Sequence, residues 1–393
     1  MDGEIGIGSL LAVSVVSALA PVLLGLLPRL RVPQVVLLIA GGIVIGPQGL
    51  GLGSPHDVQI LADVGLGFAF LLAGYEVDLR LFRQDAGRRA IVAWLVSAVL
   101  ALLVIGALAL GGLVHAYVPV ALGLTTTALG TLLPVLRENG LLHGRLGRYL
   151  LAAGAVGELF PIVAIAIFLG TQTRFVALVS LAGVGLLALL LAVAPRVVRR
   201  ESRLGTVVAL GQHETSQIVL RATLLLLILL IAVANEFHLD AVLGAFLAGM
   251  VLRRWIGGRA RSTMEFKLDA VGYGFFVPLF FVYSGMGLDI RSIIEAPLRV
   301  LLFFVLMIAV RGLPALLVYR GVLTLRERTE TVLITATTLP LLVALTEIGV
   351  RNGTMLRENA AALVGAGVLS VLVLPMLASA VHRTDRPVDV SGS

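Results

Sequence analysis

The chain is a succession of long apolar runs separated by short polar segments, and this pattern sets the fold class. Most runs are about 18 to 24 residues long, the length with which an α-helix crosses the hydrocarbon core of a bilayer. We therefore predict an all-α polytopic membrane protein with about thirteen spans: residues 7–27, 34–46, 58–77, 90–114, 117–136, 149–170, 175–194, 218–234, 239–252, 268–287, 298–319, 332–350 and 360–381.

Composition and charge support this class and add an orientation. Hydrophobic residues make up 59% of the 393 residues and charged residues only 13%, against roughly a quarter in soluble domains. The net charge is +7, but the basic residues are scattered between the apolar runs, which argues against a nucleic-acid partner. The sequence has no cysteine, so disulfides and thiol chemistry are excluded. With the amino terminus outside, cytoplasmic segments hold 23 of the 30 Lys and Arg residues and outside segments hold 5. This bias predicts a multi-pass protein of a bacterial-type plasma membrane with a cytoplasmic carboxyl terminus.

Two short sequences recur at a common offset of 211 residues. Residues 74–80 (GYEVDLR) correspond to residues 285–291 (GMGLDIR), and Thr126-Thr127 correspond to Thr337-Thr338. An offset of seven predicted spans gives the two copies opposite topology, as in the inverted repeats of secondary transporters. We therefore expect a first repeat with a linker helix (1–194), a cytoplasmic loop (195–217), a second repeat (218–382) and a short cytoplasmic tail (383–393).

Two ionisable residues lie deep within predicted spans, where a charge is expensive. They are Glu158 in the sixth span and Arg311 in the eleventh. Counted at about 1.5 Å per residue through a core about 30 Å thick, their depths differ by about 4 Å, so the two side chains can pair. Glu158 is the candidate for a carboxylate that holds either a proton or a monovalent cation, with Arg311 as its counter-charge. The alternative is a static buried ion pair between packed helices.

Two threonine clusters accompany these charges. Residues 125–127 lie in the fifth span and residues 335–338 in the twelfth, each close to Gly or Pro. Consecutive β-branched polar residues in this context allow a membrane helix to unwind, and the freed carbonyls and hydroxyls are suitable ligands for a hard cation. The alternative is that threonine only packs between helices. We predict Thr126 and Thr127 at the ion and proton site, and Thr337 and Thr338 at a second crossover.

No other pattern in the sequence suggests chemistry. The six histidines fall in loops or at span ends without metal-ligand spacing, and no nucleophile–base or paired-carboxylate arrangement points to hydrolysis. The glycine-rich segments 41–46 and 244–249 are interpreted as positions of close helix packing. We predict a protein that is not an enzyme and carries no cofactor.

With these residues in view, nearly the whole chain resembles the cation:proton antiporter superfamily, particularly its sodium/proton and Kef-type potassium branch. The resemblance is carried by residues 70–78 (FLLAGYEVD), 125–129 (TTTAL), 244–249 (GAFLAG) and 278–289. It implies a thirteen-helix homodimer with a dimer scaffold made by spans one to three and eight to ten. It also implies a mobile core of spans four to six and eleven to thirteen, in which spans five and twelve unwind and cross.

The family also implies an acidic motif in span six, usually Asp-Asp or Asn-Asp, opposite a basic residue in span eleven. These positions are Gly157-Glu158 and Arg311 here, so the first polar residue is absent and the second is one methylene longer. A single titrating carboxylate favours one-for-one, electroneutral exchange. We also expect none of the nucleotide-binding regulation found in gated potassium-efflux proteins.

Together these observations predict a secondary active transporter that exchanges Na⁺ or K⁺ for protons by alternating access. Glu158 is the predicted shared carboxylate, and the expected partners are the transported ions, the lipid bilayer and a second copy of the chain. Two alternatives stay open from the sequence: a channel-like or symport pathway on the same fold, and a transport-inactive membrane sensor or scaffold.

Overall fold

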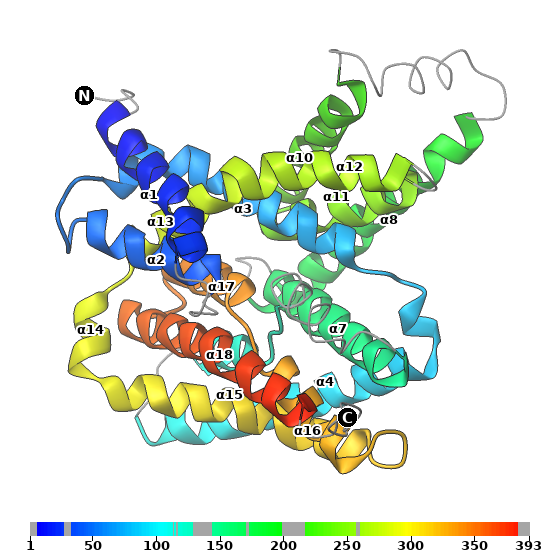
Figure 1. The fold of residues 1–393 in the computed structure, drawn as a ribbon. Helices are drawn as coiled ribbons and strands as arrows, with labels where there is room; N and C mark the ends of the chain where they lie inside the picture. The colour runs from blue at the N-terminus through cyan, green and yellow to red at the C-terminus, as the bar shows by residue number, and fades with distance from the viewer. Residues whose placement is uncertain are drawn as a thin grey trace, which may run out of the picture. The chain divides into compact units, whose positions relative to one another are not determined.

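The structure is a computed structural model in which the regular elements are helices (Figure 1). It describes residues 6–26, 33–112, 114, 117–128, 144–169, 173–198, 217–256 and 260–383. The chain separates into two compact units, and the boundary on α7 (Gly144–Phe168) falls between Pro161 and Ile162.

Unit 1 comprises Met1–Leu30, Gln34–Val77 and Ile162–Leu288. A π-helical turn at Gly272–Phe276 joins α12 and α13 into one continuous helix. The ring of Phe276 in this turn stacks on Phe68 of α3. Besides the second part of α7, the helices of this unit are α1 (Ile7–Leu26), α2 (Gln34–Ile45), α3 (Pro55–Glu76), α8 (Arg174–Val198), α10 (Ile218–Glu236), α11 (Ala241–Trp255), α12 (Ala260–Val271) and α13 (Val277–Gly287).

Unit 2 comprises Arg31–Pro33, Asp78–Pro161 and Asp289–Ser393. The first part of α7 belongs to it, and a capping box at Thr324 and Glu327 fixes the start of α16. The other elements are the short 3₁₀ helix Leu81–Arg83, α4 (Asp85–Leu110), α5 (Tyr117–Leu124), α14 (Ile290–Glu295), α15 (Pro297–Val318), α16 (Leu325–Thr335), α17 (Pro340–Arg351) and α18 (Arg357–Arg383).

This division groups most helices as the family resemblance implies, but it splits α7, the helix of predicted span six, between the units. Helices α1 to α3 and α10 to α13, from predicted spans one to three and eight to ten, share unit 1, while the helices of predicted spans four, five, eleven, twelve and thirteen share unit 2. The division into two inverted repeats is a different partition of the chain and stays a prediction.

Ten helical stretches in the described part of the chain are long and apolar enough to cross a membrane, and α2 is a shorter apolar helix. The predicted fold class is confirmed, while the count of thirteen is not. Predicted span five continues past Ala128 into residues outside the described part, and the stretch Leu325–Arg351 is interrupted between α16 and α17.

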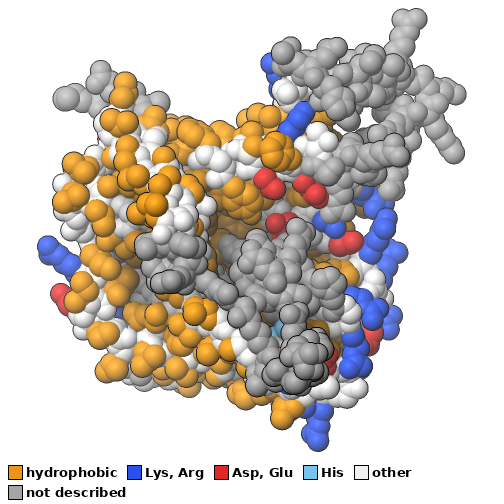
Figure 2. Space-filling view, viewed as in Figure 1, with side chains coloured by type: hydrophobic (Ala, Val, Ile, Leu, Met, Phe, Trp, Pro, Cys, Tyr) orange, Lys and Arg blue, Asp and Glu red, His pale blue; other side chains and the backbone are white. Residues whose placement is uncertain are grey.

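The surface of the helices agrees with a lipid environment. Figure 2 shows hydrophobic side chains spread over the exposed faces of the helices, and large apolar residues that are at least two thirds exposed include Ile60, Leu103, Leu110, Leu225 and Leu298. In water such faces would favour aggregation, whereas acyl chains solvate them.

The glycine-rich segments of unit 1 are packing positions, as predicted. A Cβ on Gly249 or Gly74 would collide with backbone atoms of the facing helix in the contact between α3 and α11, and one on Gly42 or Gly285 would do so between α2 and α13. Membrane helices gain van der Waals contact when small residues let their backbones approach. These segments therefore hold unit 1 together and form no ligand loop.

Candidate functional site

Two helices of unit 2 are interrupted at the threonine clusters. Helix α5 ends at Leu124 and the following residues, 125–128, are not helical; α16 ends at Thr335 and α17 begins at Pro340 after the non-helical residues 336–339. Pro340 has no N–H to donate, which favours a break before it. The predicted interruptions of the fifth and twelfth spans are both found.

The two non-helical segments contact each other directly. The backbone N–H of Ala128 donates to the carbonyl of Thr337 at 3.0 Å, and the hydroxyls of Thr126 and Thr338 lie 2.7 Å apart. Thr127 Oγ1 donates to the carbonyl of Thr335 at 2.6 Å. Threonines that occupy equivalent positions at the 211-residue offset therefore meet at one crossing, which we call the crossover (residues 125–128 and 335–339).

Threonine hydroxyls also donate to carbonyls in the last turns of α5 and α16, where the regular helical hydrogen-bond pattern ends. Thr125 and Thr126 donate to the carbonyls of Leu122 and Gly123 at 2.8 and 2.7 Å, and Thr337 donates to the carbonyl of Leu333 at 2.9 Å. The threonines of both segments are 0 to 3% exposed. Because an unsatisfied polar group is costly at this burial, these side chains are the physical reason that the backbone can unwind here.

Sequence reasoning missed one residue of the crossover. Ser370 of α18 accepts a hydrogen bond from the N–H of Thr338 at 3.1 Å, and its own hydroxyl lies 2.9 Å from the carbonyl of Thr338 and 2.7 Å from that of Gly367. It is completely buried. The available signal was a serine within an apolar stretch of α18, which by itself does not name its partner.

Arg311 lies within unit 2 with its guanidinium at the crossover. Its side chain is buried, with the whole residue only 4% exposed. Nη2 donates to Thr127 Oγ1 at 2.7 Å, and Nε points to the carbonyl of Thr335 at 3.4 Å. Arg311 thus places a positive charge against both interrupted segments, and its predicted pairing with Glu158 stays a prediction.

Glu158 lies on α7 and is buried, with 6% of its surface exposed. The residue before it, Gly157, contacts the crossover directly. The N–H of Thr127 donates to the carbonyl of the preceding residue, Gly157, at 3.0 Å. A Cβ at position 157 would meet Thr127 Oγ1 at 2.5 Å and Arg311 Nη2 at 2.8 Å. The acid, the base and the hydroxyls predicted from sequence are therefore carried by segments that contact one another.

The oxygen atoms at the crossover come from threonine hydroxyls and backbone carbonyls. No group of three or more His, Asp or Glu side chains able to hold a metal ion occurs in the described residues. In the described part of the chain, the segments that meet here carry the carboxylate of Glu158 together with hydroxyl and carbonyl oxygens, the kinds of atom that bind hard cations.

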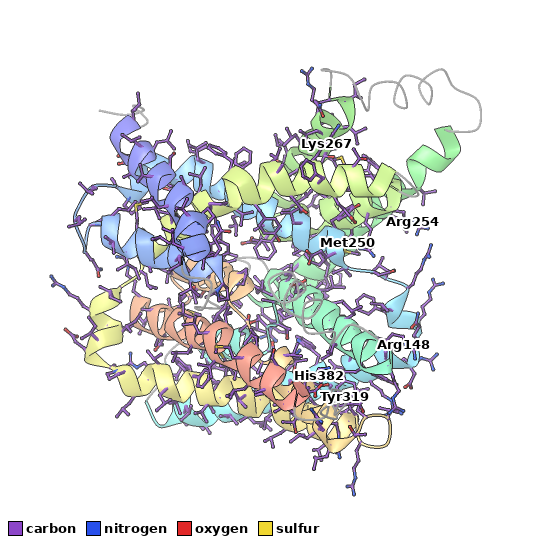
Figure 3. The ribbon with its side chains drawn as sticks, viewed as in Figure 1. Arg148, Met250, Arg254, Lys267, Tyr319 and His382 are labelled. Carbon is purple, nitrogen blue, oxygen red and sulfur yellow. The ribbon has the colours of Figure 1, made fainter. Side chains whose placement is uncertain are left out.

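A second buried acid of unit 2 was also missed. Glu330 of α16 is 1% exposed and lies 3.4 Å from Arg326 Nε and 3.3 Å from His382 Nδ1. Figure 3 labels His382, in the last turn of α18. His382 therefore contacts a buried carboxylate, whereas its sequence position suggested a surface residue. His115, His143 and His213 lie outside the described residues.

Comparison with known proteins decides the family. A family model described as "Sodium/hydrogen exchanger, transmembrane" matches residues 14–383. The chain belongs to the sodium/hydrogen exchanger family.

Individual members of the sodium/hydrogen exchanger family are distant from this chain in sequence. The chain is 27% identical to the Bacillus subtilis protein YjbQ over 311 residues, 74% of this chain and 48% of that relative. It is 29% identical to cation/H⁺ antiporter 18 of Arabidopsis thaliana, covering 72% of this chain and 37% of that protein. It is 25% identical to the Na⁺/H⁺-K⁺ antiporter GerN of Bacillus cereus, covering 67% of this chain and 68% of that protein. The chain thus spans about half the length of YjbQ and less than half the length of the plant relative.

The fold agrees with the family. The sodium proton antiporter MjNhaP1 of Methanocaldococcus jannaschii, solved at pH 8, superposes with a TM-score of 0.66 at 18% identity, covering 96% of this chain and 97% of that one. At this identity the likeness concerns the fold, and the chemistry rests on the crossover residues of this chain.

Proposed function

We propose that the protein exchanges Na⁺ or K⁺ for protons across a membrane, with Glu158 as the carboxylate that holds either a proton or the cation. The observation that carries this proposal is the burial of Glu158 beside a crossover built from hydroxyls and carbonyls. Family membership supports it, because relatives are named for Na⁺/H⁺, cation/H⁺ and Na⁺/H⁺-K⁺ antiport.

The exchange follows from the chemistry of one acid in a desolvated place. A buried carboxylate is costly as a bare anion, so it is stable when it has bound a proton or a metal cation. One carboxylate cannot hold both well, and loading with one therefore requires release of the other. Since Glu158 is the acid beside the crossover in the part of the chain that the structure describes, we expect one proton for one cation and electroneutral transport.

Alternating access requires that the loaded carboxylate face each side of the membrane in turn. Glu158, Thr126, Thr127, Arg311, Thr337 and Thr338 belong to a single compact unit, which supports movement of the site as one body. We further propose a homodimer with its amino terminus outside, on the strength of the family resemblance and the charge bias of the sequence.

Flux in proteoliposomes tests the assignment. The full chain is reconstituted with a pH dye inside, and Na⁺ or K⁺ is added outside; the dye should report proton movement that depends on the cation. Glu158→Gln should abolish this signal because the amide cannot exchange a proton for a cation. The matched control is Glu358→Gln, which changes an exposed acid of the same unit that pairs with Arg299.

The outcomes separate the rival functions. Full-rate exchange by Glu158→Gln would contradict the role of Glu158. Cation-dependent conductance without proton counterflow would indicate a channel-like pathway, and absence of both flux and thermal stabilisation by Na⁺ or K⁺ would indicate a transport-inactive protein. A rate that scales with an imposed membrane potential would contradict electroneutrality.

A further inference from the structure

The residue before Glu158 has no side chain, and the space that a side chain would need is already filled. A Cβ built on Gly157 would lie 2.5 Å from Thr127 Oγ1, 2.7 Å from Thr127 Cβ and 2.8 Å from Arg311 Nη2. All three separations are shorter than Cβ atoms tolerate, so any other residue would force a displacement.

Neither neighbour can move away cheaply. Thr127 is 1% exposed and is held from three sides: its N–H bonds Gly157, its hydroxyl donates to Thr335, and the same hydroxyl accepts from Arg311. Its Cβ is fixed to the backbone of the crossover, so relief requires that α7 and the crossover separate. The guanidinium of Arg311 is at the end of a longer side chain, but displacing it would leave a buried charge without its acceptor.

Gly157 also differs in kind from the other close-packed glycines. In unit 1 the backbone of a facing helix blocks Gly42, Gly74, Gly249 and Gly285, and in unit 2 the nearest atoms to Gly123 and Gly312 belong to leucine and valine side chains. At Gly157 the blocking atoms are a hydroxyl and a guanidinium nitrogen of the crossover. Gly157 is therefore blocked by polar side-chain atoms of the site, whereas the six glycines just named are blocked by facing backbone or apolar side chains.

We infer that Gly157 is a positioning residue for the proposed exchange: by lacking a side chain it lets the Arg311–Thr127 bridge lie against α7 beside Glu158. The Gly-Glu motif is then not a degenerate site, because the bridge and a side chain at position 157 exclude each other. This inference rests on the proposed role of Glu158, and it predicts that a side chain at position 157, an acidic one included, impairs the protein.

The test uses Gly157→Ala and Gly157→Asp in the full chain, with Gly106→Ala on α4 as the matched control, because a Cβ there meets no atom within 4 Å. Each protein is reconstituted, and the KM for Na⁺ and the maximal rate are read from the internal pH dye. Pushing α7 off the crossover separates Glu158 from the threonine oxygens, so both position-157 variants should raise KM by about fivefold or more. A loss of folded protein alone would lower the maximal rate and leave KM unchanged.

Thermal unfolding in detergent gives a second readout that does not depend on transport. Gly157→Ala should lower Tm in the parent protein and lower it much less when Thr127 is also changed to Gly, since that change removes two of the three blocking atoms. Wild-type KM and Tm in Gly157→Ala or Gly157→Asp would overturn the inference, as would an equal loss of Tm in both backgrounds. If the parent shows no Na⁺- or K⁺-dependent flux, the proposed function fails, while the pair of Tm differences still decides the spatial claim.

Discussion

Ser370 offers the sharpest stability test of the crossover, because its hydroxyl accepts a backbone N–H of the non-helical segment 336–339. Ser370→Ala removes the acceptor of the Thr338 N–H, and both residues are 0% exposed. A buried donor left without its partner costs about 1–3 kcal/mol. Alanine returns about 0.5 kcal/mol through its higher helix propensity. We therefore expect a net loss of about 0.5–2.5 kcal/mol from these two effects.

The same helix contains a matched control. Ser379 is also buried on α18, but its hydroxyl donates only to the carbonyl of Pro375, four residues earlier. That carbonyl is also the normal acceptor of the N–H at position 379 in an α-helix, so Ser379→Ala leaves no backbone group without a partner. Its expected effect is near zero or slightly stabilising.

Thermal unfolding of the detergent-purified variants, followed by tryptophan fluorescence at one scan rate, measures the difference. Ser370→Ala should unfold a few degrees below Ser379→Ala. It should also exchange cations more slowly, because the crossover loses the hydrogen bond that holds Thr338 to α18. Ser370→Thr keeps the hydroxyl and should recover part of the loss. Equal Tm values for the two alanine variants would refute the claim that Ser370 holds the crossover.

Two further predictions concern charged groups of unit 2. Arg311→Lys keeps the charge but loses the planar fork that reaches Thr127, so proteoliposome flux should fall by about tenfold or more, whereas Arg299→Lys at an exposed ion pair should change it little. Hydrogen bonds from Ser292 hold the pKa of Asp289, at the start of α14, below its ordinary value of 3.8. The ionised Asp289 therefore stabilises the folded protein at pH values above 3.8, and this contribution is lost as the pH falls through the lowered pKa. Ser292→Ala should therefore lower Tm at neutral pH, and the difference should shrink in acid; a gap that persists in acid would contradict the linkage.

Much of the fold follows from run length and local chemistry, which is why it could be predicted from sequence. A bilayer requires long apolar helices, and the runs identified most of them. The interruptions at residues 125–128 and 336–339 were also predicted, because Thr and Pro act on the backbone within a few residues. The number of spans was not settled, since short and broken helices such as α2 and α16–α17 do not follow the length rule.

The site was predictable only as a set of candidates. Glu158 and Arg311 are conspicuous because charge is rare in such runs, but the sequence does not say which atoms the guanidinium contacts. Thr126 and Thr338 are 212 residues apart, and no local signal encodes their bond. At Gly157 the sequence showed only that a polar residue is absent, and the structure adds that Thr127 and Arg311 fill the space of a side chain there.

The hydrogen bonds of the crossover bear on how strongly it can hold a cation. A hydroxyl has one proton and two lone pairs. Thr127 Oγ1 donates its proton to the carbonyl of Thr335 and accepts a hydrogen bond from Arg311 with one lone pair, so one lone pair remains. In the proposed exchange, a cation bound to Glu158 could contact Thr127 Oγ1 without breaking the crossover, but this one lone pair would bind it weakly and the neighbouring guanidinium would repel it. Weak ligation of this kind favours release on the far side, which an exchanger needs as much as it needs binding.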